Sequence, residues 1–341
     1  MSNIITLPAA CDMHVHLRDP GQTYKTDIAE GTRIAAANGI ADIVMMPNTA
    51  PPIDNAAMVT RLRERIAHIG ATCSRPRAAE CRPYANVHII AAVTVGQRGQ
   101  ELTDFAALKQ AGVVALSDDG IPVSDVIMEA AMREAQAVGL PLIDHCEPEI
   151  EQVSRDCELA AKTGVPIHIA HVSRANALAF IRQAKRDGLP VTCEVAPHHF
   201  TFTKDAVATF GGNARMAPPL ATQADIEAVL EALQDGTIDA IATDHAPHHW
   251  VEKMRNKPPN GIIGLETLWP ATLTALYFTG LLTLEQIVDK LCHAPRRILG
   301  LPSTDETVQI DLDAEYTYQP SGRCVNTPFT GMKLRGKVTY E

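Results

Sequence analysis

The 341-residue sequence has few aromatic residues and no long apolar run. Aromatic side chains make up 4% of the residues while 46% are hydrophobic, so the predicted core is aliphatic. No apolar run approaches the roughly 20 residues that a membrane-spanning helix needs. The N-terminus MSNIITLPAA also lacks the basic segment followed by a long apolar stretch that marks a signal peptide. We therefore expect no membrane association and no secretion.

An excess of positive charge and closely spaced cysteine pairs are missing as well. The net charge of −10 argues against a nucleic-acid partner, although a metal ion or an arginine can still create a local site for an anionic substrate. The eight cysteines are scattered without a Cys-x-x-Cys motif, which favours a reduced, cytoplasmic protein. Cys73 and Cys81 are predicted to be free thiols. The arginine-dense stretch 61–83 is interpreted as a solvated helix and loop.

Short apolar segments, several of them β-branched, alternate with alanine-rich helical segments. The predicted strands begin near residues 11, 41, 86, 113, 141, 166, 190 and 239. Helices are expected at 26–39, 124–139, 175–188 and 222–236, with a final helix near 266–279. This alternation predicts an α/β protein with a parallel sheet buried on both faces, and eight units suggest a closed (β/α)₈ TIM barrel. An open doubly wound sheet is the alternative, but no G-x-G-x-x-G follows the first strand.

Polar residues gather where the predicted strands end. Nine of the thirteen histidines lie at such ends: 14, 16, 145, 171, 198, 199, 245, 248 and 249. In a TIM barrel the carboxyl ends of all strands meet at one rim, which is the catalytic face. A single histidine at a strand end is usually a satisfied polar group, but enrichment at seven ends points to a functional rim.

The first strand carries two of these histidines. Residues i and i+2 of a strand share a face, so His14 and His16 are expected to point together into the barrel mouth. Imidazole nitrogens are zinc ligands, although a His-x-His pair alone is a weak signal. Further candidate ligands follow other strands: Asp118, Asp119, His145, His171 and Asp244. Together they are enough for two metal ions. His168 is expected on the opposite face, as a structural residue.

Nine segments carry a resemblance to a known family. They are DMHVHLRDPG, VMMPNTAPPID, LSDDG, DHCE, HIAHVS, TCEVAPHH, IATDHAPH, GIIGLET and NTPFTGMKLRGKV, in this order from residue 12 to 338. With them, the chain resembles the type I dihydroorotases of the amidohydrolase superfamily over nearly its whole length. His-x-His is generic to the superfamily, whereas HVHLRDPG combined with MPNT and ATDHAPH is much more specific.

The resemblance implies a centre with two zinc ions. The implied ligands are His14, His16 and Asp244 for the first zinc and His145 and His171 for the second. An aspartate of the Asp-Asp-Gly segment would bridge the metals, with Asp119 at the matching position and Asp118 as the alternative. Hydantoinases bridge their metals with a carboxylated lysine, and the strand VVALSDD contains no lysine.

The resemblance also implies a substrate site and a reaction. The implied substrate contacts are Arg18 and Asn48 for an α-carboxylate, and His248 with the backbone around Asn260 and Gly261 for a ring. Arg18 has the planar fork that binds a carboxylate in bidentate fashion. The implied reaction is the reversible cyclisation of N-carbamoyl-L-aspartate to L-dihydroorotate in pyrimidine biosynthesis. Asp244 would act as the general base and then as the general acid.

Some features depart from the family pattern. The chain begins almost at the first barrel strand, so we expect residues 1–300 to form the barrel. Residues 301–341 would be the remnant of a small β side domain that is reduced or absent. Ala217 stands where relatives often have an asparagine that contacts the substrate. These departures reduce the implied substrate contacts but leave every implied metal ligand in place.

Two alternative functions therefore stay open. The protein could be a zinc-binding but weakly active or inactive homologue that acts as a partner of aspartate transcarbamoylase. It could also be another cyclic amidase of the hydantoinase or allantoinase type, against which the missing lysine argues. We also expect a homo-oligomer, namely a dimer.

Overall fold

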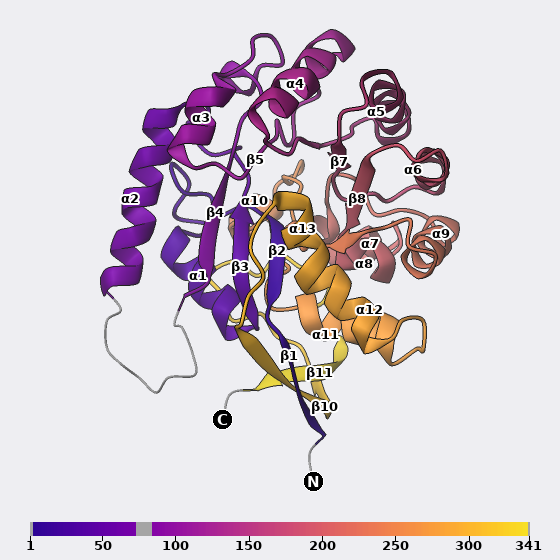
Figure 1. Ribbon diagram of the computed structural model, residues 1–341. Coiled ribbons are helices and arrows are strands. Elements are labelled where there is room, and N and C mark those ends of the chain that lie inside the picture. Colours follow the sequence, from indigo (N-terminus) through magenta and orange to yellow (C-terminus); the bar gives the residue numbers. More distant parts are fainter. Residues whose placement is uncertain (1–2, 73–83, 340–341) are drawn as a thin grey trace.

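The computed structural model describes residues 3–72 and 84–339, and its centre is a curled parallel sheet of eight strands (Figure 1). The strands are β2 (Ala10–Val15), β3 (Ile40–Met45), β4 (Asn86–Ala91), β5 (Ala115–Leu116), β6 (Ile143–Asp144), β7 (Ile167–Ile169), β8 (Val191–Val195) and β9 (Ala240–Ile241). They form two four-stranded sheets, β2-β3-β4-β5 and β6-β7-β8-β9. Parallel bridges from Leu116 to Leu142 and from Val15 to His245 join the sheets at both seams. The eight expected strands are confirmed, and they close into a barrel.

Helices surround the strands on the outside of the barrel (Figure 1). The long ones are α1 (Ile28–Ala37), α2 (Ala56–Thr72), α3 (Phe105–Ala111), α4 (Asp125–Val138), α5 (Glu149–Thr163), α6 (Ala175–Arg186) and α9 (Gln223–Gln234). Shorter helical segments lie in the loops: η1 (Val95–Gln97), α7 (Pro197–Thr201), α8 (Ala206–Phe210), η2 (Gly211–Ala214) and α10 (Trp250–Lys253). The four expected helices α1, α4, α6 and α9 are confirmed.

Local sequence signals account for where these helices begin and end. Asp27 caps α1 by accepting a hydrogen bond from the Glu30 amide, and Thr222 forms a capping box at the start of α9. Gly139 ends α4 in the left-handed conformation, with φ of 69°. Ser124 occupies the N-cap position of α4, but its side chain makes no capping hydrogen bond.

The prediction that the last helix lies near 266–279 was wrong. That segment contains α11 (Leu268–Thr272) and the π-helical η3 (Leu273–Tyr277), but three more helical segments follow: α12 (Leu284–Val288), η4 (Asp289–His293) and α13 (Ala294–Leu299). Thr283 starts α12 with a capping box. Pro295 lies inside this helical region, at the first turn of α13, where a proline is tolerated.

A second, antiparallel sheet lies beside the barrel and contains the first and the last of the described strands (Figure 1). Its strands are β1 (Ile4–Pro8), β10 (Thr307–Thr317) and β11 (Lys333–Thr339), with β10 in the middle. Ile5 pairs with Ile310, and Tyr316 pairs with Leu334. A small β side sheet is therefore present, and β1 joins it instead of the barrel, because its backbone pairs with β10.

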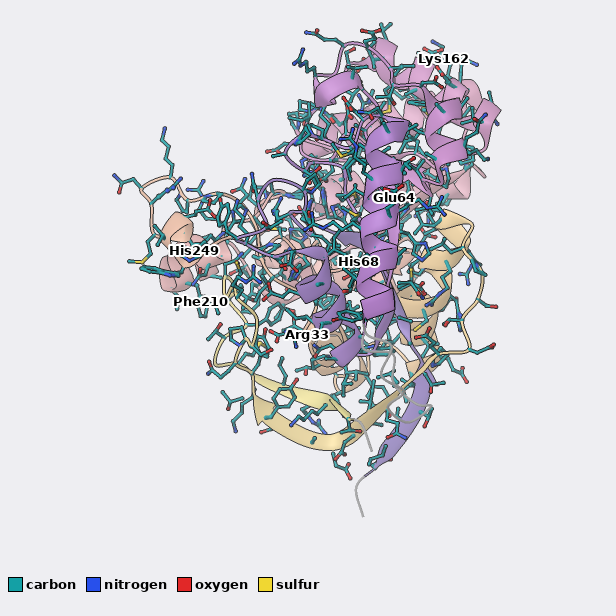
Figure 2. The ribbon with its side chains drawn as sticks, turned by 90° about the vertical axis from the view of Figure 1, so that its left-hand side faces the viewer. Arg33, Glu64, His68, Lys162, Phe210 and His249 are labelled. Atoms are coloured by element: carbon teal, nitrogen blue, oxygen red, sulfur yellow. The ribbon has the colours of Figure 1, made fainter. Side chains whose placement is uncertain are left out.

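Helix α2 exposes charged residues, and the described cysteines are free thiols. Helix α2 carries the first part of the arginine-dense stretch, and Figure 2 shows Glu64 and His68 on its outer face. The rest of that stretch, with Cys73 and Cys81, lies outside the described residues. The other six cysteines are free and buried. Within residues 3–72 and 84–339, no helix combines the length and apolar character that crossing a membrane requires.

Candidate active site

The carboxyl ends of the barrel strands bring the sequence-predicted ligands together. His14 belongs to β2, and His16 follows this strand directly. The other ligands come one to three residues after their strands: Asp119 after β5, His145 after β6, His171 after β7 and Asp244 after β9. All six side chains are buried. The barrel closure thus gathers residues that are up to 230 positions apart in sequence, as from His14 to Asp244.

One group of candidate ligands contains His14, His16 and Asp244. The Nε2 atoms of His16 and His14 lie 3.0 and 3.5 Å from Asp244 Oδ1. One ligand atom from each residue fits within 4.8 Å of the others, which is the spacing of a metal-binding group. Asp244 adopts a positive φ of 46°, a strained backbone conformation for a non-glycine residue that is typical of functional positions.

A second group lies next to the first and is centred on Asp119. Its Oδ1 atom is 3.3 Å from His145 Nδ1 and 3.8 Å from His171 Nε2, and these two ring nitrogens are 2.8 Å apart. The same Oδ1 atom is 3.4 Å from His14 Nε2, while Oδ2 is 3.6 Å from His16 Nε2. Asp119 therefore faces both histidine pairs.

Asp118, the alternative bridging residue, points elsewhere. Its carboxylate accepts hydrogen bonds from the backbone amide of Thr94, at 3.1 Å, and from the Thr94 hydroxyl. These bonds tie the loop after β5 to the loop after β4. In the structure Asp119 is part of the histidine cluster, and Asp118 is a support behind it.

The charges of the cluster stabilise one another. Burial alone would raise the pKa of Asp119 and Asp244, but hydrogen bonds and charge interactions with the histidines hold both well below the usual value. Burial opposes protonation of His145, yet hydrogen bonds with Asp119 and Glu147 raise its pKa to about 10. A proton on His145 therefore competes with a metal ion for the ring nitrogens of this side chain.

This donor set fits a divalent metal ion such as zinc. His14 Nε2 is fully buried and has no hydrogen-bond partner among the described residues, although it faces both Asp119 and Asp244. A cation between these groups would satisfy the orphaned nitrogen and both carboxylates. Imidazole nitrogen and carboxylate oxygen are also the donors that zinc takes in catalytic sites.

Two supporting carboxylates were missed in the sequence. Glu194 on β8 is fully buried and lies 2.7 Å from His14 Nδ1, and burial is outweighed by His14 and His168, which lower its pKa to about 2. Asp12 accepts a hydrogen bond from the Thr243 amide at 2.9 Å, next to Asp244, and burial raises its pKa to about 7. The sequence signal that could have found Glu194 and Asp12 is a charged residue inside an otherwise apolar, buried strand. His168 bonds to Thr192 at 2.8 Å, and its Nε2 atom lies 3.5 Å from Glu194 Oε2, so it faces the carboxylate that supports His14 instead of the opposite side of the strand.

Asn48 lies in the cluster, but its amide is already occupied. Its Oδ1 atom is 2.8 Å from His16 Nδ1, and its Nδ2 atom donates to Asp119 Oδ2 at 2.8 Å. The residue therefore orients one candidate ligand from each metal group. This contact differs from the expected contact with a substrate carboxylate, because both ends of the amide point to protein atoms.

Arg18 and His248 lie next to each other, in the loops that follow β2 and β9. Arg18 Nη2 is 3.4 Å from His248 Nε2, and its Nε atom donates to the Pro247 carbonyl at 3.4 Å. Among the residues that the structure describes, no carboxylate pairs with the guanidinium within 4 Å. Arg18 therefore keeps most of its donors for a ligand.

The expected backbone contact at Asn260 and Gly261 is only partly available. Asn260 is exposed, whereas the Gly261 amide donates to the Arg215 carbonyl at 2.9 Å. The Gly261 carbonyl accepts hydrogen bonds from Lys253 and Asn326, at 2.8 and 2.9 Å. These two residues, also missed in the sequence, hold this loop beside His248.

The fold is shared with solved hydantoinases. The L-hydantoinase (dihydropyrimidinase) of Arthrobacter aurescens matches with a TM-score of 0.83 at 22% identity, over 98% of this chain and 83% of that one. A D-hydantoinase matches with a TM-score of 0.80 at 18% identity, with the same coverage. The likeness shows the fold, and the buried His/Asp cluster at the barrel rim defines the class as a barrel protein with a candidate metal centre.

Sequence similarity specifies the family within this class. The family described as dihydro-orotase-like matches residues 3–168. Dihydroorotases from Acetivibrio thermocellus and Geobacter metallireducens are 40% and 39% identical to this chain. These alignments cover 98% and 99% of this chain and 85% and 86% of the relatives. The chain belongs to the dihydroorotase family.

Proposed function

We propose that this site catalyses the reversible cyclisation of N-carbamoyl-L-aspartate to L-dihydroorotate, a step of pyrimidine biosynthesis. The identity of about 40% to dihydroorotases over nearly the whole chain supports this reaction. The observation that carries it is the position of Arg18, whose guanidinium has no carboxylate partner among the described residues and lies near the carboxylates of the histidine cluster. A substrate with a carboxylate next to a reacting amide matches this arrangement.

Two zinc ions are the proposed cofactors. His14, His16 and Asp244 would hold one, His145 and His171 the other, and Asp119 would contact both. When bound, such ions polarise a carbonyl group and lower the pKa of water. The Asp119 carboxylate, which faces both histidine pairs, supports two ions more than one.

Asp244 is the proposed proton carrier. In the hydrolytic direction it accepts the proton of the attacking water and delivers it to the ring nitrogen as the amide bond breaks. In the biosynthetic direction it takes the proton from the ureido nitrogen as this atom attacks the side-chain carboxylate, and it returns the proton to the departing oxygen. The C–O bond then breaks, and this oxygen leaves as hydroxide, which takes up one solvent proton to become water. The neighbouring His14 and His16 lower the pKa of Asp244, which keeps the carboxylate ionised.

Arg18 and His248 are the proposed contacts for the substrate α-carboxylate and ring. The backbone near Asn260 and Gly261 would border the ring, although the Gly261 polar groups already have partners. Ala217 is half-buried and brings no hydrogen-bonding side chain. Asn48 would act on the substrate mainly through His16 and Asp119, the residues to which it is bonded.

The decisive experiment uses one purified sample. Zinc per chain is measured together with the interconversion of carbamoyl aspartate and dihydroorotate, and hydantoin and allantoin serve as control substrates. Two zinc ions with turnover of dihydroorotate alone support the proposal. Zinc binding without turnover, with activity appearing only on addition of aspartate transcarbamoylase, would support the partner hypothesis. Turnover of hydantoin or allantoin in place of dihydroorotate would support another cyclic amidase.

Two further expectations remain proposals. One is that the sheet of β1, β10 and β11 is a reduced form of a larger side domain, with a boundary near residue 300. The other is a homodimer, which light scattering of the purified protein would test.

A further inference from the structure

His248 lies between two buried cationic side chains. The Lys25 ammonium is 3.1 Å from its Nδ1 atom, and Arg18 Nη2 is 3.4 Å from its Nε2 atom. Lys25 and His248 are 5% and 7% exposed, so water does not screen the contact between them. Figure 2 places the next residue, His249, at the outer edge of the molecule, whereas the His248 side chain is buried.

The contact with Lys25 determines which ring nitrogen carries the proton. An ammonium group has three donors and no acceptor, so Nδ1 must accept, and the single proton of a neutral imidazole then sits on Nε2. Glu252 Oε2 is the other neighbour of Nδ1, but it is farther away at 3.5 Å and already accepts from the His249 amide at 3.1 Å. Burial, together with Arg18 and Lys25, lowers the pKa of His248 to about 3, which keeps the ring neutral.

With this tautomer, His248 and Arg18 present donors to each other. The Nε2–H group and the guanidinium cannot satisfy one another, so both need an acceptor from outside the protein. An oxygen atom of an anionic group, placed between them, would accept from both. This arrangement is a two-sided donor site whose geometry depends on Lys25.

The C-terminal segment holds both partners of this contact in place. Asn326 Oδ1 accepts from the His248 amide at 3.0 Å, and its Nδ2 donates to the Ala246 carbonyl at 3.0 Å. Two residues earlier, Cys324 Sγ lies 3.1 Å from the Lys25 carbonyl. The loop after β2 and the loop after β9 are therefore fastened to one short segment, which sets the distance from Lys25 to His248.

We propose that Lys25 is a positioning residue that fixes the Nε2–H tautomer of His248, so that His248 and Arg18 bind one carboxylate oxygen of the substrate together. This inference rests on the proposed function for the identity of the substrate. The tautomer and the binding of a carboxylate can both be measured without turnover, so the two proposals can fail separately.

The test compares Lys25→Met, which removes the donor, with Lys25→Arg, which keeps a donor and the charge. Lys290→Met is the matched control, because Lys290 is equally buried but donates to the Ile238 carbonyl, away from the site. Each zinc-loaded protein is labelled with ¹⁵N-histidine, and the ring nitrogen shifts of His248 are recorded. Calorimetry measures the dissociation constant of N-carbamoyl-L-aspartate.

In the Lys25→Met variant we expect the His248 shifts to lose the pure Nε2–H pattern. We expect the dissociation constant to rise about ten- to hundredfold, the loss typical of a hydrogen bond to a charged group. Lys25→Arg should keep the His248 shifts and the dissociation constant close to those of the wild-type protein, and Lys290→Met should change neither. Weaker binding with an unchanged tautomer would mean that Lys25 acts by charge alone and would overturn the inference, as would unchanged binding. Tight binding by a wild-type protein that lacks turnover would reject the proposed function only.

Discussion

His14 Nδ1 lies 2.7 Å from Glu194 Oε1, so a candidate metal ligand on β2 is anchored by a carboxylate from β8. Both side chains are fully buried. When Nδ1–H donates to Glu194, the lone pair of Nε2 is free and faces Asp119 and Asp244. A carboxylate of this kind fixes the tautomer of a ligating histidine and raises its basicity.

Glu194→Gln should therefore weaken metal binding. The amide can still accept from His14 but carries no charge, so we expect the zinc affinity to fall about 10- to 100-fold. Competition with a coloured chelator measures this affinity. Glu266→Gln is the control, since Glu266 accepts from Tyr318 and Ser321 outside the cluster. Equal zinc affinity in both variants would remove Glu194 from the support of the metal site.

Asp244→Asn should separate metal binding from chemistry. The amide oxygen keeps one weak donor for a metal and His14 and His16 remain, so we expect zinc to be largely retained. Turnover of dihydroorotate should be lost, because an amide cannot carry the proton between water and the ring nitrogen. Zinc analysis and a spectrophotometric assay on the same sample check both points. Near-normal turnover in this variant would exclude Asp244 as the proton carrier.

Asn48→Ala distinguishes two roles for the same residue. Its bonds to His16 and Asp119 predict a loss of zinc affinity, with a near-normal dissociation constant for carbamoyl aspartate once zinc is saturating. A direct contact with the substrate carboxylate instead predicts a near-normal zinc affinity and a higher dissociation constant for carbamoyl aspartate. The two titrations, performed on one preparation, decide between these roles.

Stability should decrease in acid because some histidines are buried in the neutral form. Burial lowers the pKa of His199 from 6.5 to about 4, and its Nε2 atom bonds to the Pro218 carbonyl at 3.0 Å. The unfolded chain takes up this proton below pH 6.5, whereas the folded chain does not until about pH 4. The stabilisation is complete above pH 6.5 and is lost as the pH falls toward 4.

Denaturant unfolding of the wild-type protein and of His199→Gln between pH 7 and 4 checks this prediction. The glutamine can still donate to Pro218 but does not titrate. The difference in unfolding free energy between the wild-type protein and the variant should change by about 1.4 kcal/mol per pH unit below pH 6.5 and stay constant above pH 6.5. A difference that is independent of pH would show that His199 does not titrate in this way.

Much of the barrel and the cluster could be predicted because the signals are local. Alternation of apolar strands and helices depends on short-range periodicity, and the eight strands lie where this pattern placed them. The two-residue period of a strand likewise put His14 and His16 on one face. Helix α13 was missed because Pro295 interrupts the helical pattern in the sequence, and α12 was missed because its five residues are too few to show a helical period.

Contacts across the barrel were decided only by the tertiary structure. Adjacent carboxylates in the loop after β5 look equivalent in sequence, yet the loop turns Asp119 to the histidines and Asp118 to Thr94. Glu194 meets His14 across 180 residues because barrel closure sets the register of β8 relative to β2. Sequence therefore determined the elements and the chemistry of the rim, since these follow from local period and residue type. Which carboxylate faces a metal, and that Lys25 faces His248, depended on loop conformation and strand register, which no local pattern encodes.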